Sequence, residues 1–323
     1  MQKKIFVTRE IPQIGIDILL QYYEVDIFPK KRPITKEEMI SGAMDCDGLL
    51  PLLTDKVDAE VMDETGIKAI ANYAVGVDNI DVAAASQRNI AVTNTPGVLT
   101  DATADLTWAL LLSVSRRIVE ADKYLREGNF LGWDSMLYLG GDFAGRTIGI
   151  IGLGRIGQAV ARRAAGFDMN IIYHSTSPHP NLERSLGMKR VSLEELLKES
   201  DYVSIHTPYN KETHHLIGKK ELEIMKPSAY LINTSRGKIV NEEELVVALV
   251  TGKIDGAGLD VYYHEPKVHK GLIDLPNVVL LPHLGSASMY TRSKMAMMAA
   301  ENLHMALSGE RPENIVNPEI YDK

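Results

Sequence analysis

A glycine-rich segment, residues 152–157, has the residue types and the spacing needed to bind a pyrophosphate group. Its sequence is Gly-Leu-Gly-Arg-Ile-Gly; it follows the apolar run 147–151 and precedes a helical pattern over 158–165. Such a turn holds phosphate against free backbone N–H groups at the positive end of a helix. The motif is meaningful only between a strand and a helix, and this segment has that context, so it predicts a dinucleotide-binding turn. The alternative is an ordinary tight connection between a strand and a helix.

Three polar residues with complementary chemistry follow three other strand-like segments. Arg236 comes after 229–233, Glu265 after 257–260, and His283 after 278–281. In an open α/β sheet, ligands bind outside the carboxyl ends of the strands. We therefore expect these three side chains at the same edge of a sheet as the glycine turn.

The trio suits chemistry on a carbonyl acid. Arginine offers a planar fork that matches a carboxylate, and histidine exchanges a proton near neutral pH. A glutamate hydrogen-bonded to one imidazole nitrogen sets the tautomer and favours the charged ring. Taken singly, each residue has a simpler explanation: Arg236 as a surface ion pair, His283 as a turn residue and Glu265 as a solvated carboxylate. Their joint occurrence beside a dinucleotide turn favours catalysis.

The elements that would position these residues form two series of strands. The first series comprises 3–8, 24–28, 48–52, 67–72 and 90–93, with helical patterns at 35–43 and 82–87 between them; the second comprises 147–151, 170–174, 202–206, 229–233, 257–260 and 278–281. Six strands separated by helices are what two mononucleotide-binding halves require. The predicted fold is therefore α/β, with two parallel-sheet domains: a Rossmann dinucleotide-binding domain and a flavodoxin-like substrate domain.

Two long helical patterns, 101–120 and 289–307, are predicted to be the crossings between the domains. The last one would return the chain to the first domain and make that domain discontinuous. The expected division is 1–98 with 289–323 for the substrate domain and 99–288 for the dinucleotide domain, with a ligand cleft between them.

Composition excludes several other classes of protein. The chain has 323 residues, 45% of them hydrophobic and 24% charged, with a formal net charge of −8. These values exclude a disordered or fibrous chain, and the negative charge argues against binding to nucleic acid or anionic lipid. No apolar run reaches bilayer length and no secretory leader is recognisable, so we expect a cytoplasmic protein without membrane partners. The adjacent His214 and His215 lack partners spaced for metal binding, so no metal site is expected.

The motifs together resemble the NAD(P)-dependent D-2-hydroxyacid dehydrogenase family over essentially the whole chain. They are the glycine turn and the segments 233–237 (Asn-Thr-Ser-Arg-Gly), 258–261 (Gly-Leu-Asp-Val), 265–266 (Glu-Pro) and 282–286 (Pro-His-Leu-Gly-Ser). Segments 92–105 and 145–151 most resemble the glyoxylate/hydroxypyruvate reductase branch. The resemblance implies reduction of small 2-oxo acids, such as glyoxylate and hydroxypyruvate, to 2-hydroxy acids by hydride transfer.

The resemblance also implies roles for individual residues. Arg236 would clamp the substrate, His283 would give the proton to the carbonyl oxygen, and Glu265 would orient and charge His283. The N–H groups of Val75 and Gly76 would hold the substrate carboxylate, with Leu52 and Leu53 walling the pocket. The predicted cofactor contacts are Thr103, Gly152, Leu153, Gly154, Arg155, Ile156, Gly157, His174, Ser175, Thr176, Thr207, Pro208, Thr234, Ser235, Asp260, His283 and Gly285.

The residues after strand 170–174 bear on the choice of cofactor. A carboxylate about 20 residues beyond the glycines normally accepts from the ribose 2′-hydroxyl and selects NAD. Here His174, Ser175 and Thr176 stand instead, which would not repel a 2′-phosphate, although no arginine directly follows Thr176. We therefore expect NADP(H) to be preferred, with NAD(H) possible.

The predicted fold is compatible with several other activities and with more than one state of assembly. D-lactate, phosphoglycerate and 2-ketogluconate dehydrogenases share the fold, as do cofactor-sensing corepressors, whereas a formate dehydrogenase should carry glutamine in place of Glu265. An apolar stretch before the dinucleotide strand predicts a homodimer, against the alternative of a loop packed on its own domain: Phe130, Trp133, Met136, Leu137 and Tyr138.

Overall fold

A computed structural model describes residues 2–322, and these divide into two compact units. The first unit combines the chain up to Leu99 with the chain from Ser286 onward, and the second is Thr100–Gly285. Each unit is built on one sheet in which every strand pair is parallel. The predicted fold class of two parallel-sheet α/β domains is confirmed.

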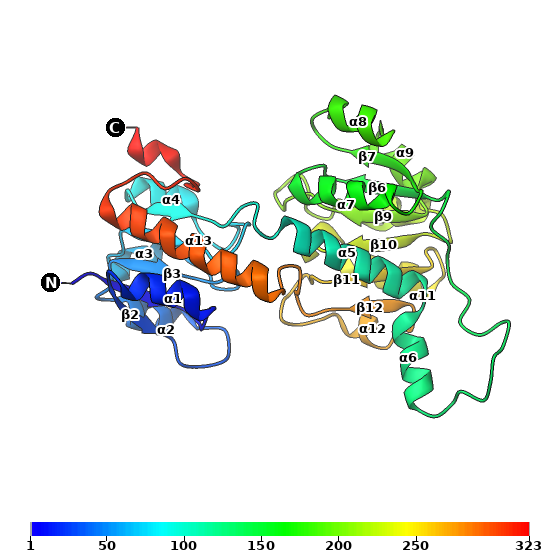
Figure 1. Ribbon diagram of the computed structural model, residues 1–323, viewed down its shortest axis with the longest axis horizontal. Helices are drawn as coiled ribbons and strands as arrows, with labels where there is room; N and C mark the ends of the chain where they lie inside the picture. The colour runs from blue at the N-terminus through cyan, green and yellow to red at the C-terminus, as the bar shows by residue number, and fades with distance from the viewer. Residues whose placement is uncertain (1, 323) are drawn as a thin grey trace. The chain divides into compact units, whose positions relative to one another are not determined.

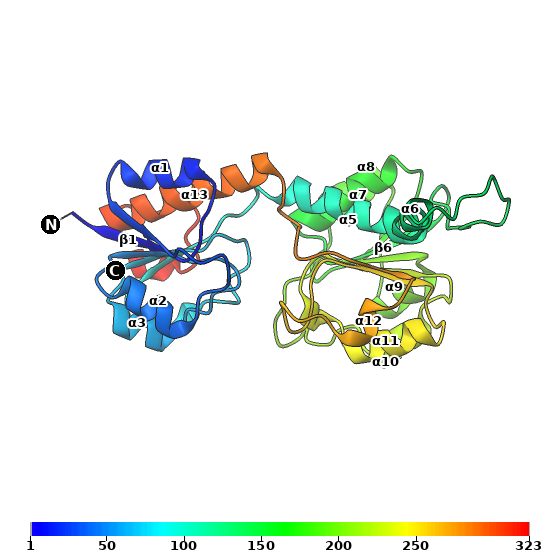
Figure 2. The same cartoon turned by 90° about the horizontal axis from the view of Figure 1, so that it is seen from below.

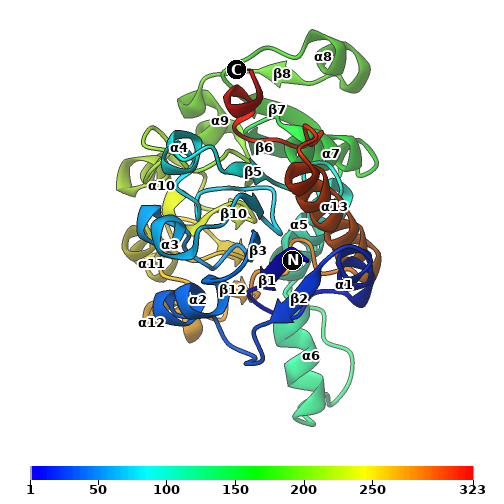
Figure 3. The same ribbon diagram turned by 90° about the vertical axis from the view of Figure 1, so that its left-hand side faces the viewer.

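The sheet of the first unit has five strands in the order β2-β1-β3-β4-β5. Helices α1 and α13 cover one face, and α2, α3 and α4 cover the other (Figure 3). The strands are β1 (Lys4–Val7), β2 (Glu24–Ile27), β3 (Gly48–Leu50), β4 (Ala69–Ala71) and β5 (Ala91–Thr93); the helices are α1 (Gln13–Leu20), α2 (Lys36–Ala43), α3 (Ala59–Thr65), α4 (Val82–Gln87), α13 (Met289–Ser308) and a final 3₁₀ turn, Pro318–Tyr321.

Side-chain alternation explains how this sheet is buried on both faces. Ile5 and Val7 pack toward α1 and α13, whereas Phe6 between them packs toward α2. The long helix α13 begins at the N-cap Ser288 and ends at Gly309, which adopts the left-handed conformation typical of a helix C-terminus. It lies against α1, where a Cβ on Gly15 would approach Ala296 to 2.8 Å. Close helix packing therefore ties the last long helix to the N-terminal unit.

The sheet of the second unit has seven strands in the order β12-β11-β10-β9-β6-β7-β8. Helices α5, α7 and α8 lie on one face and α9 to α12 on the other (Figure 2). The strands are β6 (Thr147–Ile151), β7 (Asn170–His174), β8 (Lys189–Arg190), β9 (Tyr202–Ile205), β10 (Tyr230–Asn233), β11 (Gly256–Leu259) and β12 (Val278–Leu280); the helices are α5 (Thr100–Ser115), α6 (Ile118–Arg126), α7 (Arg155–Ala165), α8 (Pro180–Leu186), α9 (Leu193–Glu199), α10 (Lys219–Ile224), α11 (Glu242–Val250) and α12 (Lys270–Ile273), with a 3₁₀ turn at Gly237–Ile239.

Two expectations about these elements are wrong. The predicted second series has six strands, but β8 adds a seventh; its two basic, exposed residues carry no apolar pattern. The predicted helix 101–120 is two helices, because Arg117 takes a left-handed conformation (φ 52°) between α5 and α6. After α6 the chain comes back to the end of α5. There the N–H of Gly141 donates to the carbonyl of Ser115 at 2.9 Å, so this carbonyl of the last turn has a partner.

The second sheet determines where polar loop residues meet. Because β6, β9, β10, β11 and β12 run parallel, the loops that follow them open at one edge. Figure 1 shows these strands side by side between their helices. Within residues 2–322, no helix is both long and apolar enough to cross a membrane.

Candidate active site

The glycine turn lies between β6 and α7. Gly152 has a positive φ of 92°, and a Cβ there would come within 2.7 Å of the His206 carbonyl, so only glycine fits. Gly154 is the N-cap of α7, and a Cβ on it would meet nothing within 4 Å. No side chain caps this helix. The turn therefore presents uncapped N–H groups beside open space, which fits the pyrophosphate of a dinucleotide.

His283 and Glu265 form a hydrogen-bonded pair at the ends of β12 and β11. The distance from His283 Nδ1 to Glu265 Oε2 is 2.8 Å, and the side chains are equally exposed at 25%. The other carboxylate oxygen, Oε1, accepts the Tyr262 N–H at 3.0 Å. Burial alone would raise the pKa of Glu265, but hydrogen bonding and attraction to His283 bring that pKa below its usual range. Glu265 is thus held as a carboxylate facing one imidazole nitrogen, leaving the other nitrogen for a ligand.

Asp260 holds the backbone that carries His283. Its carboxylate oxygens accept the N–H groups of Leu284 and Gly285 at 2.6 and 2.8 Å, and its carbonyl accepts the His283 N–H at 2.9 Å. His283 adopts a left-handed conformation with φ 55°, which a non-glycine residue takes only when its surroundings impose it. Burial raises the pKa of Asp260, although these N–H donors act against the rise. Asp260 therefore acts as a clamp on the turn that aims the imidazole.

Arg236 follows β10 and is part-buried. Asn233 positions the turn: its side-chain amide donates to the Arg236 carbonyl at 3.0 Å, and its side-chain oxygen accepts the Ser235 N–H at 3.0 Å. The Arg236 guanidinium donates to the Ser235 carbonyl through Nη1 at 2.8 Å, and its charge contributes to the lowered pKa of Glu265. The fold thus brings the three residues of the predicted trio to neighbouring strand ends.

A buried chain of hydroxyl groups connects several residues predicted to contact the cofactor. The Thr103 hydroxyl donates to the Gly285 carbonyl at 3.0 Å, and Thr107 bridges from the Thr103 carbonyl (2.8 Å) to the Thr234 hydroxyl (2.9 Å). The Ser235 hydroxyl, next to Thr234, donates at 2.5 Å to the carbonyl of Thr207 on the loop after β9. Helix α5 is therefore tied to the loops after β10 and β12, which makes this edge of the sheet one connected surface.

The remaining predicted cofactor residues lie on the same edge. His174 ends β7, with Ser175 and Thr176 on the loop that follows, and Pro208 is exposed after β9. His206 hydrogen-bonds Ser204 through Nε2 at 2.8 Å, and burial lowers its pKa to about 3. His206 therefore stays neutral near neutral pH and is a poor proton donor.

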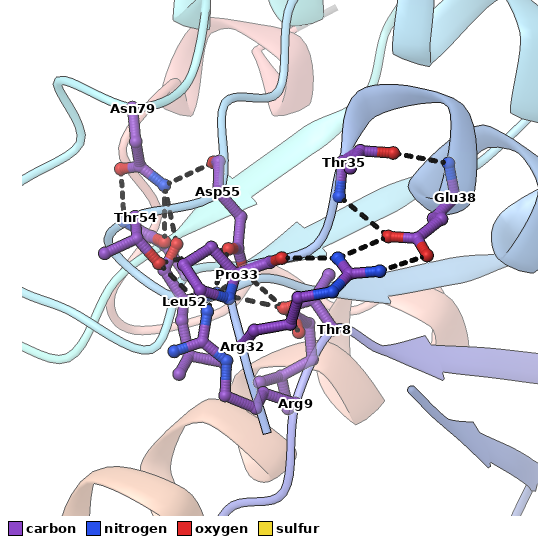
Figure 4. A network of polar contacts seen from close by, with 12 residues as sticks. Thr8, Arg9, Arg32, Pro33, Thr35, Glu38, Leu52, Thr54, Asp55 and Asn79 are labelled. Carbon is purple, nitrogen blue, oxygen red and sulfur yellow. Dashed lines mark hydrogen bonds and ion pairs between the residues drawn. The ribbon is translucent and has the colours of Figure 1, made fainter. Parts of the chain in front are cut away.

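Leu52, predicted to wall the substrate pocket in the first unit, lies in a polar network with Thr8, Asp55 and Asn79 (Figure 4). Buried Asp55 accepts the Leu52 N–H at 2.9 Å and the Thr8 hydroxyl at 2.5 Å. The Asn79 side-chain amide is 3.1 Å from the Leu52 carbonyl and pairs with the Asn72 amide at 3.0 and 3.1 Å. This network fixes the start of the Leu52–Leu53 loop against the loop that carries Val75.

Two side-chain amides hold the loop of Val75 and Gly76 by donating to its carbonyl oxygens. Asn94 donates to the Val75 carbonyl at 2.8 Å, and Asn72 donates to the Gly76 carbonyl at 2.8 Å. Among the described residues, neither the Val75 nor the Gly76 N–H has a protein acceptor. Two neighbouring unpaired N–H groups on an anchored loop are suited to bind an anion.

No cluster of three or more potential metal ligands occurs in the part of the chain that the structure describes. His214 and His215 lie in a turn, not on a strand, and their rings stack at 4.0 Å.

Comparison with known proteins now decides the family. The family model for the NAD-binding domain of D-isomer-specific 2-hydroxyacid dehydrogenases matches residues 108–285, all within the second unit. The chain belongs to this family. It is therefore an oxidoreductase with a nicotinamide dinucleotide cofactor, and the uncapped glycine turn fits that cofactor.

Individual relatives agree with the family over the full length. A glyoxylate reductase of Thermococcus litoralis is 49% identical over 325 residues, covering 99% of this chain and 98% of that protein. A protein of Thermus thermophilus, known from its crystal structure, has 48% identity and a TM-score of 0.92, covering 97% of this chain and 99% of that one. An NADPH-dependent glyoxylate/hydroxypyruvate reductase of Sinorhizobium meliloti, in complex with NADP and malonate, has 33% identity and a TM-score of 0.87, covering 98% and 97%.

Sequence reasoning missed several residues that support the site. Asn72, Asn79 and Asn94 lie in loops, where their amides hydrogen-bond groups distant in the sequence. Glu242 at the start of α11 accepts the Tyr263 N–H at 2.5 Å and so steadies the loop of Glu265. None of these residues stands in a periodic pattern, so no local signal could have singled them out.

Proposed function

We propose that this dehydrogenase reduces glyoxylate, and hydroxypyruvate as a second substrate, to the corresponding 2-hydroxy acids. The 2.8 Å contact between His283 and Glu265, at the same sheet edge as the glycine turn, carries the proposal, because it gives a proton donor for a carbonyl oxygen. The names of the relatives support the choice of substrate. The activity of a corepressor would not require such a pair, and Glu265 argues against a formate dehydrogenase.

His283 acts on the substrate carbonyl oxygen. When bound, the dinucleotide supplies the hydride. As negative charge grows on the substrate oxygen, the charged imidazole stabilises it and transfers its proton from Nε2, while Glu265 holds Nδ1. Asp260 maintains the aim of the ring through its three contacts with residues 283–285.

On the second unit, the Arg236 guanidinium is the donor that would bind a substrate carboxylate. On the first unit, the N–H groups of Val75 and Gly76, which have no protein acceptor among the described residues, are suited to bind an anion. In this proposal, partly buried Leu52 and Leu53 provide an apolar wall for the substrate. In this proposal the first unit is the substrate domain and the second is the dinucleotide domain.

The cofactor is NADPH in preference to NADH. No carboxylate follows β7, where His174, Ser175 and Thr176 stand instead. A carboxylate at this place would repel a 2′-phosphate, whereas hydroxyl groups donate to it.

An absorbance assay at the nicotinamide band tests the proposal. Glyoxylate, hydroxypyruvate, pyruvate and 2-ketogluconate are each run against NADPH and NADH, and kcat/KM is compared. We expect glyoxylate with NADPH to give the highest value. Turnover of pyruvate or 2-ketogluconate at a higher kcat/KM than glyoxylate would overturn the substrate, and an absence of turnover would overturn the assignment of a reductase.

We also propose a homodimer formed through the segment that follows α6, which Figure 1 shows as a long loop. Its apolar side chains are exposed: Phe130 by 55%, Trp133 by 87% and Met136 by 72%. Tyr138 differs, because its ring packs against Tyr124 and under the Arg117 guanidinium. Such a concentration of exposed apolar surface on one segment is typical of an interface.

Replacement of Trp133 by serine should therefore weaken the dimer, because a large exposed ring is the type of side chain that anchors an interface. Sedimentation at micromolar concentration should show a dimer for the wild type and a shift toward monomer for Trp133→Ser. Val250→Ser is the matched control, since Val250 on α11 is 64% exposed in the same unit. A wild-type monomer, or equal dissociation of the two variants, would contradict the proposal.

A further inference from the structure

The edge strand β8 places a guanidinium on the loop that follows β7. Arg190 pairs in register with Tyr173, one residue before the end of β7. Its Nε and Nη2 donate to the Ser175 carbonyl at 3.1 and 2.8 Å, and Nη2 also donates to the Thr176 carbonyl at 3.0 Å. A positive charge absent from the sequence after Thr176 is thus supplied by a residue from the neighbouring strand.

The guanidinium has capacity left for a ligand. Within the described residues, no carboxylate lies within ion-pair distance of Arg190, although its neighbour Lys189 pairs with Glu195 at 2.8 Å. Arg190 is exposed, and its Nη1 makes no hydrogen bond to a described residue. An exposed arginine bonded only to two carbonyl groups keeps its full charge toward solvent or an anion.

The loop itself presents donors and no acid. Arg190 occupies the carbonyl oxygens of Ser175 and Thr176, while among the described residues their N–H and hydroxyl groups have no acceptor. The first acidic side chain beyond this loop, Glu183 on α8, accepts the hydroxyl of buried Tyr173 at 2.5 Å. The end of β7 therefore carries one cation and several free donors, which is complementary to a phosphate monoester.

We infer that Arg190 determines the cofactor preference by binding the 2′-phosphate of NADPH together with the Ser175 and Thr176 donors. In a Rossmann domain, the end of the second strand faces the adenosine ribose, and an arginine there accommodates the 2′-phosphate. This inference rests on the proposed use of NADPH and is independent of which 2-oxo acid is reduced. It makes β8, a strand of two residues, a specificity element.

Titration of the full-length protein with NADPH and with NADH, followed by nicotinamide fluorescence in the absence of substrate, tests this role. Arg190→Gln should raise the Kd for NADPH about tenfold and leave the Kd for NADH within about twofold, because only NADPH carries the 2′-phosphate. Arg190→Lys keeps the charge but loses the planar fork, so its Kd for NADPH should lie between those of the wild type and Arg190→Gln. Rising ionic strength should weaken NADPH binding by the wild type more than by Arg190→Gln.

Arg184→Gln is the matched control. Arg184 is exposed on α8 and donates to Asn181 at 2.7 Å, so the variant removes the same charge near the loop without touching its carbonyl groups. If Arg190→Gln weakened the binding of NADPH and NADH equally, Arg190 would only maintain the loop, and the inference would be overturned. An unchanged Kd for NADPH in this variant would also overturn it. So would tighter binding of NADH than of NADPH by the wild type. Glyoxylate turnover by the wild type is measured separately. Absence of this turnover, together with intact selectivity for NADPH, would refute the proposed substrate and leave the role of Arg190 unaffected.

Discussion

Replacement of His283 by alanine should lower kcat for glyoxylate reduction by about 10²–10⁴-fold, the usual contribution of a positioned general acid. The expectation follows from the geometry at Nδ1, where Glu265 Oε2 lies at 2.8 Å and leaves Nε2 as the proton donor. His206 cannot take over, because burial lowers its pKa to about 3 and Ser204 occupies its Nε2. Steady-state kinetics with saturating cofactor measures the effect.

Binding of NADPH separates a catalytic effect from a structural one. The Kd for NADPH should change by less than about twofold in His283→Ala, because the glycine turn and the β7 loop are untouched. His264→Ala is the control: His264 is exposed on the loop of Glu265, and its removal should leave kcat near the wild-type value. Near-normal turnover by His283→Ala would remove this residue from the mechanism.

Replacement of Arg236 by lysine should lower kcat/KM for glyoxylate by about 10- to 100-fold. Lysine keeps the positive charge but loses the planar fork, and a hydrogen bond to a charged group is worth about 1.5–3 kcal/mol. Lysine also cannot reproduce the geometry of the guanidinium, whose Nη1 donates to the Ser235 carbonyl at 2.8 Å. The loss should be visible in KM as well as in kcat, because in the proposed function the fork both binds and orients the carboxylate.

A second arginine provides the control for this substitution. Arg88 forms a two-point ion pair with Asp63, at 2.6 and 2.7 Å, on the exposed surface of the first unit. Arg88→Lys therefore makes the same chemical change without reaching the candidate site, and kcat/KM should be unaffected. If Arg236→Lys retained the wild-type kcat/KM, the proposal that its guanidinium clamps the carboxylate would fail.

The sequence by itself determined the fold class and the family. The glycine turn and the strand-like runs are local signals: strands buried on both faces need continuous apolar stretches, and a phosphate-binding turn needs glycine where a side chain would collide. The motifs at 233–237, 258–261 and 282–286 supported the family, which the match over residues 108–285 confirms. The placement of Arg236, Glu265 and His283 at strand ends followed from parallel topology alone.

Local signals failed where a contact distant in sequence decided the conformation. The break after α5 depends on Arg117 taking a left-handed conformation and on Gly141 returning to the Ser115 carbonyl. The strand β8 has two exposed basic residues and exists because it pairs with the edge of β7. An apolar pattern reports burial, whereas both residues of β8 are exposed and Arg117 is only partly buried.

Only the tertiary structure decided how the candidate site is held and how its charge is distributed. The left-handed turn at His283 depends on Asp260, and the loop of Val75 and Gly76 depends on amides from Asn72 and Asn94. The cation near the end of β7 comes from Arg190, across a strand pairing. Hydrogen bonds and charges act through space between residues separated by many positions, so a reading of neighbours along the chain does not reveal them.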